Sequence, residues 1–292
     1  GRGDQLMLGR YVIIRGVQEE FQEDIRVAHE QILTEVRGRV GIITLNRAER
    51  LNAFTGVMQS EIQGQVRAWN ADDEIGAIVL TGAGRAFSAG ADVGGFEDFV
   101  SGEGEARQAP ARPADISWVD LARESKPIVC ALNGVAVGLG ITLPLSCDVR
   151  LAAEDARISF RFLRIGVTPE YGSTHFLVNL VGLGRALEYM LTGKFITAQE
   201  AKDAGFVNHV CPAETLVDDA VALAQEIADN PAWHLAKVKR LIHENYMEKD
   251  LAQVLRRESE TLRASRFTDA HKEALTAFRE RREPNFHGQA AD

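Results

Sequence analysis

The segment from Pro127 to Asp148 constrains the fold more than any other part of this chain. Its first part, PIVCALNG, is an apolar, partly β-branched run that ends at Asn133-Gly134, which predicts a buried strand. Its second part is also apolar, but Gly138 and Gly140 stand where a helix would begin. Such a turn lets a ligand approach the backbone, and the first N–H groups of the helix suit an oxygen with negative charge. The alternative is that these glycines only allow close packing.

Strands and helices alternate on both sides of this segment. Residues 40–45 (VGIITL) and 75–80 (IGAIVL) predict buried strands, and shorter strands are expected near 149–151 and 157–160. Between the first two strands, one helical stripe carries Met58, Ile62, Val66 and Trp69. The pattern predicts an α/β core.

From Ser173 onward the pattern is mainly helical. Thr197 and Glu200 form a capping-box signature, and Gly205 marks the end of that short helix. Residues 206–210 are expected to form a last strand. Amphipathic helices follow, one of them with an apolar stripe formed by Trp233, Val238, Leu241 and Tyr246. These helices predict an appendage to the core.

Composition excludes several classes of protein. The 292 residues are 45% hydrophobic and 26% charged, as in an ordinary globular chain, and the net charge of −9 argues against binding nucleic acid or an acidic membrane surface. Cys130, Cys147 and Cys211 lack metal-ligand spacing and are interpreted as buried thiols in a reducing compartment. No apolar run is long enough to span a membrane. A cytoplasmic protein is expected.

Two glycine-rich segments, each at the point where the chain leaves a predicted strand, are candidates for a functional site; we call them strand exits. They are AFSAGAD (86–92) and GVAVGLG (134–140), and each follows a predicted buried strand. Ligands of such sheets bind outside the carboxyl ends of the strands, so two backbone N–H groups from adjacent exits can converge on one carbonyl oxygen. Each well-placed donor to a developing oxyanion is worth ~3 kcal/mol of barrier. The alternative is two tight turns without a function.

Six segments, in order, resemble the crotonase (enoyl-CoA hydratase/isomerase) superfamily. They are VGIITLNRAERLNAF, GRAFSAGAD, KPIVCALNGVAVGLG, SCDVRLAAEDARISF, a glycine-containing loop and LTGKFITAQEAKDAGFVNHV, and the resemblance covers about residues 35–285. It implies an α/β fold, a crotonase-like spiral of βαβ units at 31–230, with a C-terminal helical trimerisation region at 231–292. Residues 1–30 are interpreted as an N-terminal extension and 101–115 as a mobile surface loop.

The resemblance also implies a ligand and a site. The substrate is expected to be an acyl-CoA thioester, with no cofactor required beyond the coenzyme A of the substrate, and the protein a homotrimer or dimer of trimers. By motif position, the amides of Ala91 and Leu139 hold the thioester oxygen and stabilise an enolate. The residues that match the coenzyme A site are Arg50, Leu51, Ala53, Ala89, Asp92, Val93, Phe278 and Arg281.

Two departures from the family pattern bear on the mechanism. A hydratase that resembles the family's namesake uses two glutamates, and this chain has Thr142 and Phe162 at the matching positions. A threonine hydroxyl does not act as a base near neutral pH, and phenylalanine carries no proton to exchange. Ordinary hydration through two carboxylates is therefore disfavoured. Thr142 and Phe162 are expected to line the acyl pocket instead, together with His175.

One carboxylate, that of Glu170, remains in the loop that follows Phe162. Glu170 lies in the loop GVTPEYGST, directly after Pro169, where several isomerases of the superfamily place their single acid/base. Phe160, Phe162 and Tyr171 can supply apolar walls that raise its pKa toward neutrality. The alternative is a solvated loop residue. Asp92 and Asp148 are interpreted as structural, and His175 is a weaker second candidate for proton transfer.

These observations favour an enoyl-CoA isomerase that shifts a 3-enoyl to a 2-enoyl double bond. The alternatives are an enoyl-CoA hydratase, a hydrolytic or C–C cleaving relative, and an acyl-CoA-binding homologue without catalysis. The last alternative explains the loss of both hydratase glutamates. An RNA-binding role, known in one branch of the superfamily, is disfavoured by the net charge of −9.

Overall fold

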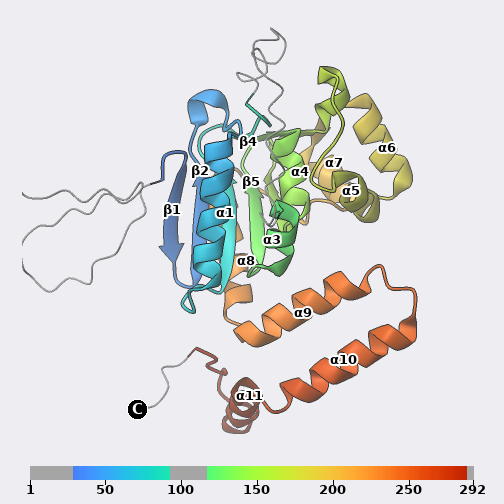
Figure 1. Cartoon of the computed structure of the whole chain (residues 1–292). Coiled ribbons are helices and arrows are strands. Elements are labelled where there is room, and N and C mark those ends of the chain that lie inside the picture. Colours follow the sequence, from blue (N-terminus) through green and yellow to red (C-terminus); the bar gives the residue numbers. More distant parts are fainter. Residues whose placement is uncertain (1–28, 93–116, 288–292) are drawn as a thin grey trace, which may run out of the picture.

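The computed structural model describes residues 29–92 and 117–287 (Figure 1). The predicted N-terminal extension, except its last two residues, and the predicted loop at 101–115 lie outside the described residues, as does Val93. Within the described ranges, no helix is both long enough and apolar enough to span a membrane.

The larger of two sheets has six strands in the order β1-β2-β3-β5-β7-β10. Its strands are β1 (Ile32–Arg37), β2 (Val40–Leu45), β3 (Ala77–Gly82), β5 (Ile128–Leu132), β7 (Val149–Ala153) and β10 (His209–Cys211). β1 is antiparallel to β2, and every later pair in the order is parallel. β5 is buried along its whole length, as its continuous apolar run predicts.

The smaller sheet has four strands in the order β4-β6-β8-β9. They are β4 (Ala86–Ser88), β6 (Val135–Val137), β8 (Arg157–Ser159) and β9 (Ile196–Thr197), of which the last is antiparallel to β8. The strands β3, β5 and β7 of the large sheet are each followed by a strand of the small sheet. The connections that follow β3, β5 and β7 therefore all begin at the carboxyl ends of these strands, along the same edge of the large sheet.

Helices cover this core (Figure 1). They are α1 (Gly56–Asn70), α3 (Trp118–Glu124), α4 (Leu139–Leu145), α5 (Ser173–Val181), α6 (Leu183–Thr192), α7 (Ala198–Ala204) and α8 (Leu216–Ala228), with 3-10 turns η1 (Ala48–Arg50) and η3 (Arg161–Ile165). The predicted stripe of α1 is confirmed, because Met58, Ile62, Val66 and Trp69 are its buried residues. The Thr197–Glu200 capping box and the end of α7 at Gly205 are also confirmed. All three cysteines are free and buried.

The last three helices are α9 (Ala232–Asn245), α10 (Leu251–Ser265) and α11 (Asp269–Glu280). They lie apart from the sheets, below them in Figure 1. Several large apolar side chains on them are exposed: Val238, Ile242, Leu251, Leu255, Leu262, Leu275 and Phe278. Exposed apolar residues in such numbers indicate a surface that another molecule covers.

Three strand predictions need correction. The strand expected at 75–80 begins at Ala77, because Ile75 closes a turn onto Asp72. The strand expected at 206–210 is β10, at 209–211, because the Phe206 ring instead packs edge-on against the ring of Phe160, 6.0 Å away between centroids. The strand expected at 157–160 stops at Ser159, where Phe160 leads into η3. Strand β1 was not predicted.

Candidate active site

The two glycine-rich strand exits lie side by side, because β4 and β6 are parallel neighbours in the small sheet. A Cβ atom on Gly90 would lie 2.8 Å from the oxygen of Val137 and 3.6 Å from the nitrogen of Leu139. A Cβ atom on Gly140 would lie 2.3 Å from the oxygen of Ser88. Only glycine fits at these approaches, so close packing accounts for Gly140. The loops that carry Ala91 and Leu139 are thereby brought into contact.

The amide of Ala91 points away from its neighbouring strand segment. Phe54 donates its N–H to the oxygen of Gly90 (2.8 Å) and accepts from the N–H of Asp92 (2.9 Å), which forms a parallel bridge between Phe54 and Ala91. In such a bridge the oxygen of Gly90 and the N–H of Asp92 point toward Phe54. The N–H of Ala91 therefore points away from Phe54. No described residue accepts a hydrogen bond from that N–H.

The amide of Leu139 also lacks an acceptor among the described residues, but for a different reason. Leu139 is the first residue of α4, and the first N–H groups of a helix have no acceptor within the helix. Gly138, with φ of 56°, turns the chain from β6 into α4 and gives its own N–H to the oxygen of Ser159. The Leu139 N–H has no acceptor in the described part of the chain. Two amides on contacting loops, neither with an acceptor among the described residues, can together hold one carbonyl oxygen on which negative charge develops.

The residues expected at the coenzyme A site are mostly neighbours of Ala91. Ala89 donates its N–H to the oxygen of Leu51, and Arg47 donates to the oxygen of Ala53. Arg47 also forms an ion pair with Asp92, with 2.8 Å between Nη2 and Oδ2. This pair gives Asp92 a structural contact. Arg50 is exposed at the end of η1.

Phe278 and Arg281 do not join this group within one chain. They lie at the end of α11, and α11 is at the opposite end of the molecule from the start of α1 and from β4 (Figure 1). The Phe278 side chain is 82% exposed.

Glu170 lies in the loop between η3 and α5. It is exposed in the single chain, yet the protein around it partly removes water from its carboxyl group, and this desolvation raises its pKa. The next residue, Tyr171, has φ of 54°, and its hydroxyl lies 3.4 Å from Oε1 of Gln59 on α1. Burial and the charge of Glu170 raise the pKa of Tyr171. The loop is thus anchored to the first turn of α1, which begins two residues after Phe54.

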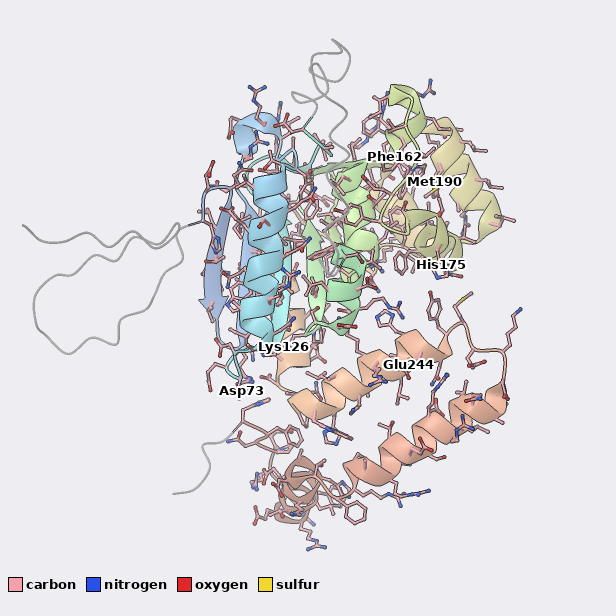
Figure 2. All side chains as sticks on the ribbon, in the orientation of Figure 1. Asp73, Lys126, Phe162, His175, Met190 and Glu244 are labelled. Carbon is pink, nitrogen blue, oxygen red and sulfur yellow. The ribbon has the colours of Figure 1, made fainter. Side chains whose placement is uncertain are left out.

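Neither position of the missing glutamates holds a group for proton transfer. Thr142 is fully buried on α4, one turn after Leu139, and its hydroxyl has no partner among the described residues. Phe162 is buried in η3. His175 lies elsewhere: its ring bonds to Tyr246, just after α9, and packs against Phe176, and Figure 2 shows it on the side of α5 that faces α9, apart from Phe162. The structure does not bring His175 to the two amides.

Sequence reasoning missed three residues whose side chains hold the segments around β4: Arg47, Asn52 and Asn133. The two asparagines stand in motifs that the sequence does show, LNA and NG. They were interpreted only as parts of a family motif and a strand end. Within residues 29–92 and 117–287, His, Cys, Asp and Glu form no cluster of three or more that could hold a metal ion.

Comparisons with known proteins identify the family of this chain. Residues 35–289 match the family model described as enoyl-CoA hydratase/isomerase. Enoyl-CoA hydratase, mitochondrial, from Pongo abelii is 36% identical over 89% of this chain and 89% of its own length. The 1,2-epoxyphenylacetyl-CoA isomerase of Escherichia coli is 34% identical over 89% of this chain and 99% of its own.

A solved structure matches as well. The crystal structure of enoyl-CoA hydratase from Bacillus anthracis has a TM-score of 0.80 and 31% identity, over 89% of this chain and 100% of that one. The predicted fold class is confirmed: two mixed sheets followed by C-terminal helices form a crotonase fold. The chain is therefore an enzyme of the enoyl-CoA hydratase/isomerase family, the crotonase superfamily that its sequence motifs predicted.

Proposed function

We propose that this enzyme isomerises 3-enoyl-CoA to 2-enoyl-CoA, with Glu170 as its single acid/base. The carboxylate removes a proton from C2 of the thioester, and the amides of Ala91 and Leu139 hold the enolate oxygen that results. The same group, now protonated, returns the proton at C4. The observation that carries this proposal is the combination of two amides that have no acceptor among the described residues, on contacting loops, with a carboxyl group of raised pKa whose loop is anchored to the first turn of α1.

This reaction fits the two substitutions in the family pattern. An isomerase moves one proton and adds no water, so it needs neither glutamate replaced by Thr142 and Phe162. One relative, from Escherichia coli, is itself named an isomerase, of 1,2-epoxyphenylacetyl-CoA. The residues at these positions would then act as walls of the acyl pocket.

The experiment is incubation with 3-enoyl- and 2-enoyl-CoAs of several chain lengths in deuterated water, with products followed by NMR and mass. The wild type should form 2-enoyl-CoA that carries deuterium. The Glu170→Gln variant should lose at least ~100-fold in turnover while it still binds acyl-CoA. Glu214→Gln, at an exposed glutamate between β10 and α8, is the matched control and should keep full activity. Near-normal isomerisation by Glu170→Gln would remove Glu170 from the mechanism.

Hydration of 2-enoyl-CoA is the second candidate function. Several relatives are named enoyl-CoA hydratase, and the hydroxyls of Thr142 and Ser173 are buried without a partner in the described residues. A buried water that bonds to such hydroxyls would satisfy them. Formation of 3-hydroxyacyl-CoA in the same incubation would favour this function. Absence of that product at every chain length would count against it.

We further propose that the active protein is a homotrimer or a dimer of trimers. The exposed apolar residues of α9 to α11 and the distance of α11 from β4 both support an arrangement in which α11 reaches the coenzyme A site of another copy (Figure 1). Sedimentation at micromolar concentration should give three or six chains, and a monomer would contradict it. Cytoplasmic location and independence from a cofactor stay predictions; activity should survive treatment with a chelator and dialysis.

A further inference from the structure

We propose that Asn52 and Asn133 are positioning residues that together fix the spacing between the amides of Ala91 and Leu139. This inference rests on the proposed role of those amides in holding a thioester oxygen. In this proposal neither side chain contacts the substrate, and both act indirectly by holding the backbone that carries the two amides. Both act through one backbone oxygen, that of Ala86, at the start of β4.

Asn52 connects the start of β4 to the turn that contains Arg47. Its side chain is fully buried, and Nδ2 donates to the oxygens of Ala83 and Ala86, both at 2.8 Å. Its Oδ1 accepts from the N–H of Arg47 at 2.9 Å. All three hydrogen bonds are buried or partly buried, so loss of the amide would leave backbone groups without partners.

The residues around Asn52 extend this contact along the chain to Ala91. Leu51 accepts from Ala89, and Phe54 bonds to both neighbours of Ala91. Segment 51–54 therefore runs beside segment 86–92 and holds it at both ends. A change at Asn52 would move the Ala91 amide through these backbone bonds.

Asn133 makes the matching link from the second exit. It follows β5 and precedes β6, six residues before Leu139. Its Oδ1 accepts from the N–H of Gly82 at 3.0 Å, and its Nδ2 donates to the oxygens of Gly84 (2.9 Å) and Ala86 (3.3 Å). A Cβ atom on the adjacent Gly134 would lie 2.3 Å from the oxygen of Arg85, so the two exits also touch here.

The Ala86 oxygen thus accepts from two side-chain amides that belong to different segments of the chain. One amide belongs to the segment that holds Ala91, and the other to the turn that leads to Leu139. A carbonyl oxygen has two lone pairs, so both donors can bond at once. This shared acceptor connects the two loops that carry the proposed donors.

Backbone conformation supports a functional reason for this arrangement. Leu51 and Asn52 have φ of 50° and 54°, a left-handed conformation that is unfavourable for leucine and better tolerated by asparagine. Among the described residues, the other non-glycine positions of this kind are Tyr171, next to Glu170, and Arg281. Strain of this kind persists where the surroundings impose it, and it clusters at functional sites.

The test uses Asn52→Asp and Asn133→Ala in the whole chain. The Asn52→Asp variant keeps the acceptor for Arg47 but loses the donor to Ala83 and Ala86. Asn133 is only half-buried, so its alanine variant should fold even where the other does not. Asn70→Ala is the matched control, because Asn70 is a half-buried asparagine that accepts from the Lys126 amide at the opposite end of the strands.

Three quantities are measured on each variant. They are the Kd of a saturated acyl-CoA by calorimetry, the rate of exchange of its C2 protons in deuterated water, and the carbonyl stretching frequency of the bound, ¹³C-labelled thioester. Each site variant should exchange ~10- to 100-fold more slowly with a Kd within about threefold of the wild type. The carbonyl frequency should move back toward its value in water. The double variant should lose less than the product of the single losses, because both act on Ala86.

Asn70→Ala should lower the melting temperature and change neither exchange nor carbonyl frequency. Wild-type exchange and frequency in both folded asparagine variants would overturn the positioning role and leave the proposed function intact. A wild-type protein that binds acyl-CoA without exchange or a carbonyl shift would overturn the proposed function, and this inference with it.

Discussion

Lys239 on α9 lies 2.7 Å from Oδ2 of Asp148, and this ion pair joins the last three helices to the core of the protein. The Lys239 side chain is only 9% exposed and also donates to the oxygen of Ala122, while Asp148 accepts from the N–H of Ile128 at the start of β5. The sequence-based interpretation of Asp148 as structural did not include this lysine, which is 91 residues away.

Loss of one partner of this pair should destabilise the protein. Lys239→Met leaves Asp148 partly buried without its counter-charge, so we expect the free energy of unfolding to fall by about 2–4 kcal/mol. Denaturant titration measures the change. Arg240→Gln breaks an exposed pair with Glu244 one residue along the same helix and should leave the unfolding midpoint unchanged. Equal effects of the two variants would contradict the importance of burial.

Substitutions at position 139 can distinguish the role of the backbone N–H from the role of the side chain. Leu139 is the first residue of α4, where proline is well tolerated, so Leu139→Pro removes the N–H while the helix can still form. We expect turnover to fall ~100- to 1,000-fold. Leu139→Ala keeps the N–H and should retain activity within about tenfold, apart from changes in acyl-chain preference. Similar turnover in the two variants would exclude the amide as a donor.

Glu170 should give the enzyme a characteristic pH profile. Desolvation raises its pKa, so the carboxylate needed for proton removal is lost at a higher pH than for an ordinary glutamate. The value of kcat/KM should therefore fall with decreasing pH, with a midpoint above the usual glutamate range. A profile that stays flat down to the range of an unperturbed glutamate would show that another group transfers the proton.

The same shift has a consequence for stability. A carboxyl group whose pKa is raised in the folded state contributes stability below its unfolded pKa, and this contribution is lost as pH rises through the folded pKa. At neutral pH the ionised Glu170 therefore works against folding. Glu170→Gln should melt slightly above the wild type at neutral pH, and the difference should shrink in acid. A lower melting temperature for the variant at neutral pH would contradict this.

Two inactive variants should restore activity when they are co-expressed. One is Glu170→Gln, and the other carries Phe278→Ala with Arg281→Ala, which weakens the proposed contact of α11 with coenzyme A. If α11 serves a neighbouring copy in a ring, about a quarter of the sites in mixed oligomers receive both intact parts. Assays at low acyl-CoA concentration should detect them. If α11 served its own chain, no intact site would form.

The sequence predicted the parts of the fold that depend on apolar periodicity. The run at 128–132 and the stripe of α1 are buried because each pattern matches the repeat of its element. Strand β1 escaped prediction because only Ile32 is buried in it. An edge strand held mainly by backbone pairing to β2 has no side-chain alternation to detect.

The candidate site also has features that the sequence could predict and features that it could not. Glycine spacing pointed to the segments after β4 and β6, and the structure brings them into close contact at Gly90 and Gly140; that their amides bind a substrate stays a prediction. The roles of Asn52 and Asn133 depend on hydrogen bonds across 34 and 47 residues to Ala86, and local sequence does not encode such pairs. His175 was grouped with the site from its distance to Glu170 along the chain, but the direction of α5 carries it toward α9.

The proposed donors at 91 and 139 belong to the main chain, and every residue except proline brings an N–H to those positions. Evolution can therefore replace the side chain at either position without deleting a catalytic group. The Leu139 side chain is buried, so a change there alters the packing around it while the peptide N–H is preserved. At these two positions the packing of the side chain and the donation of a hydrogen bond by the backbone can therefore change independently of each other.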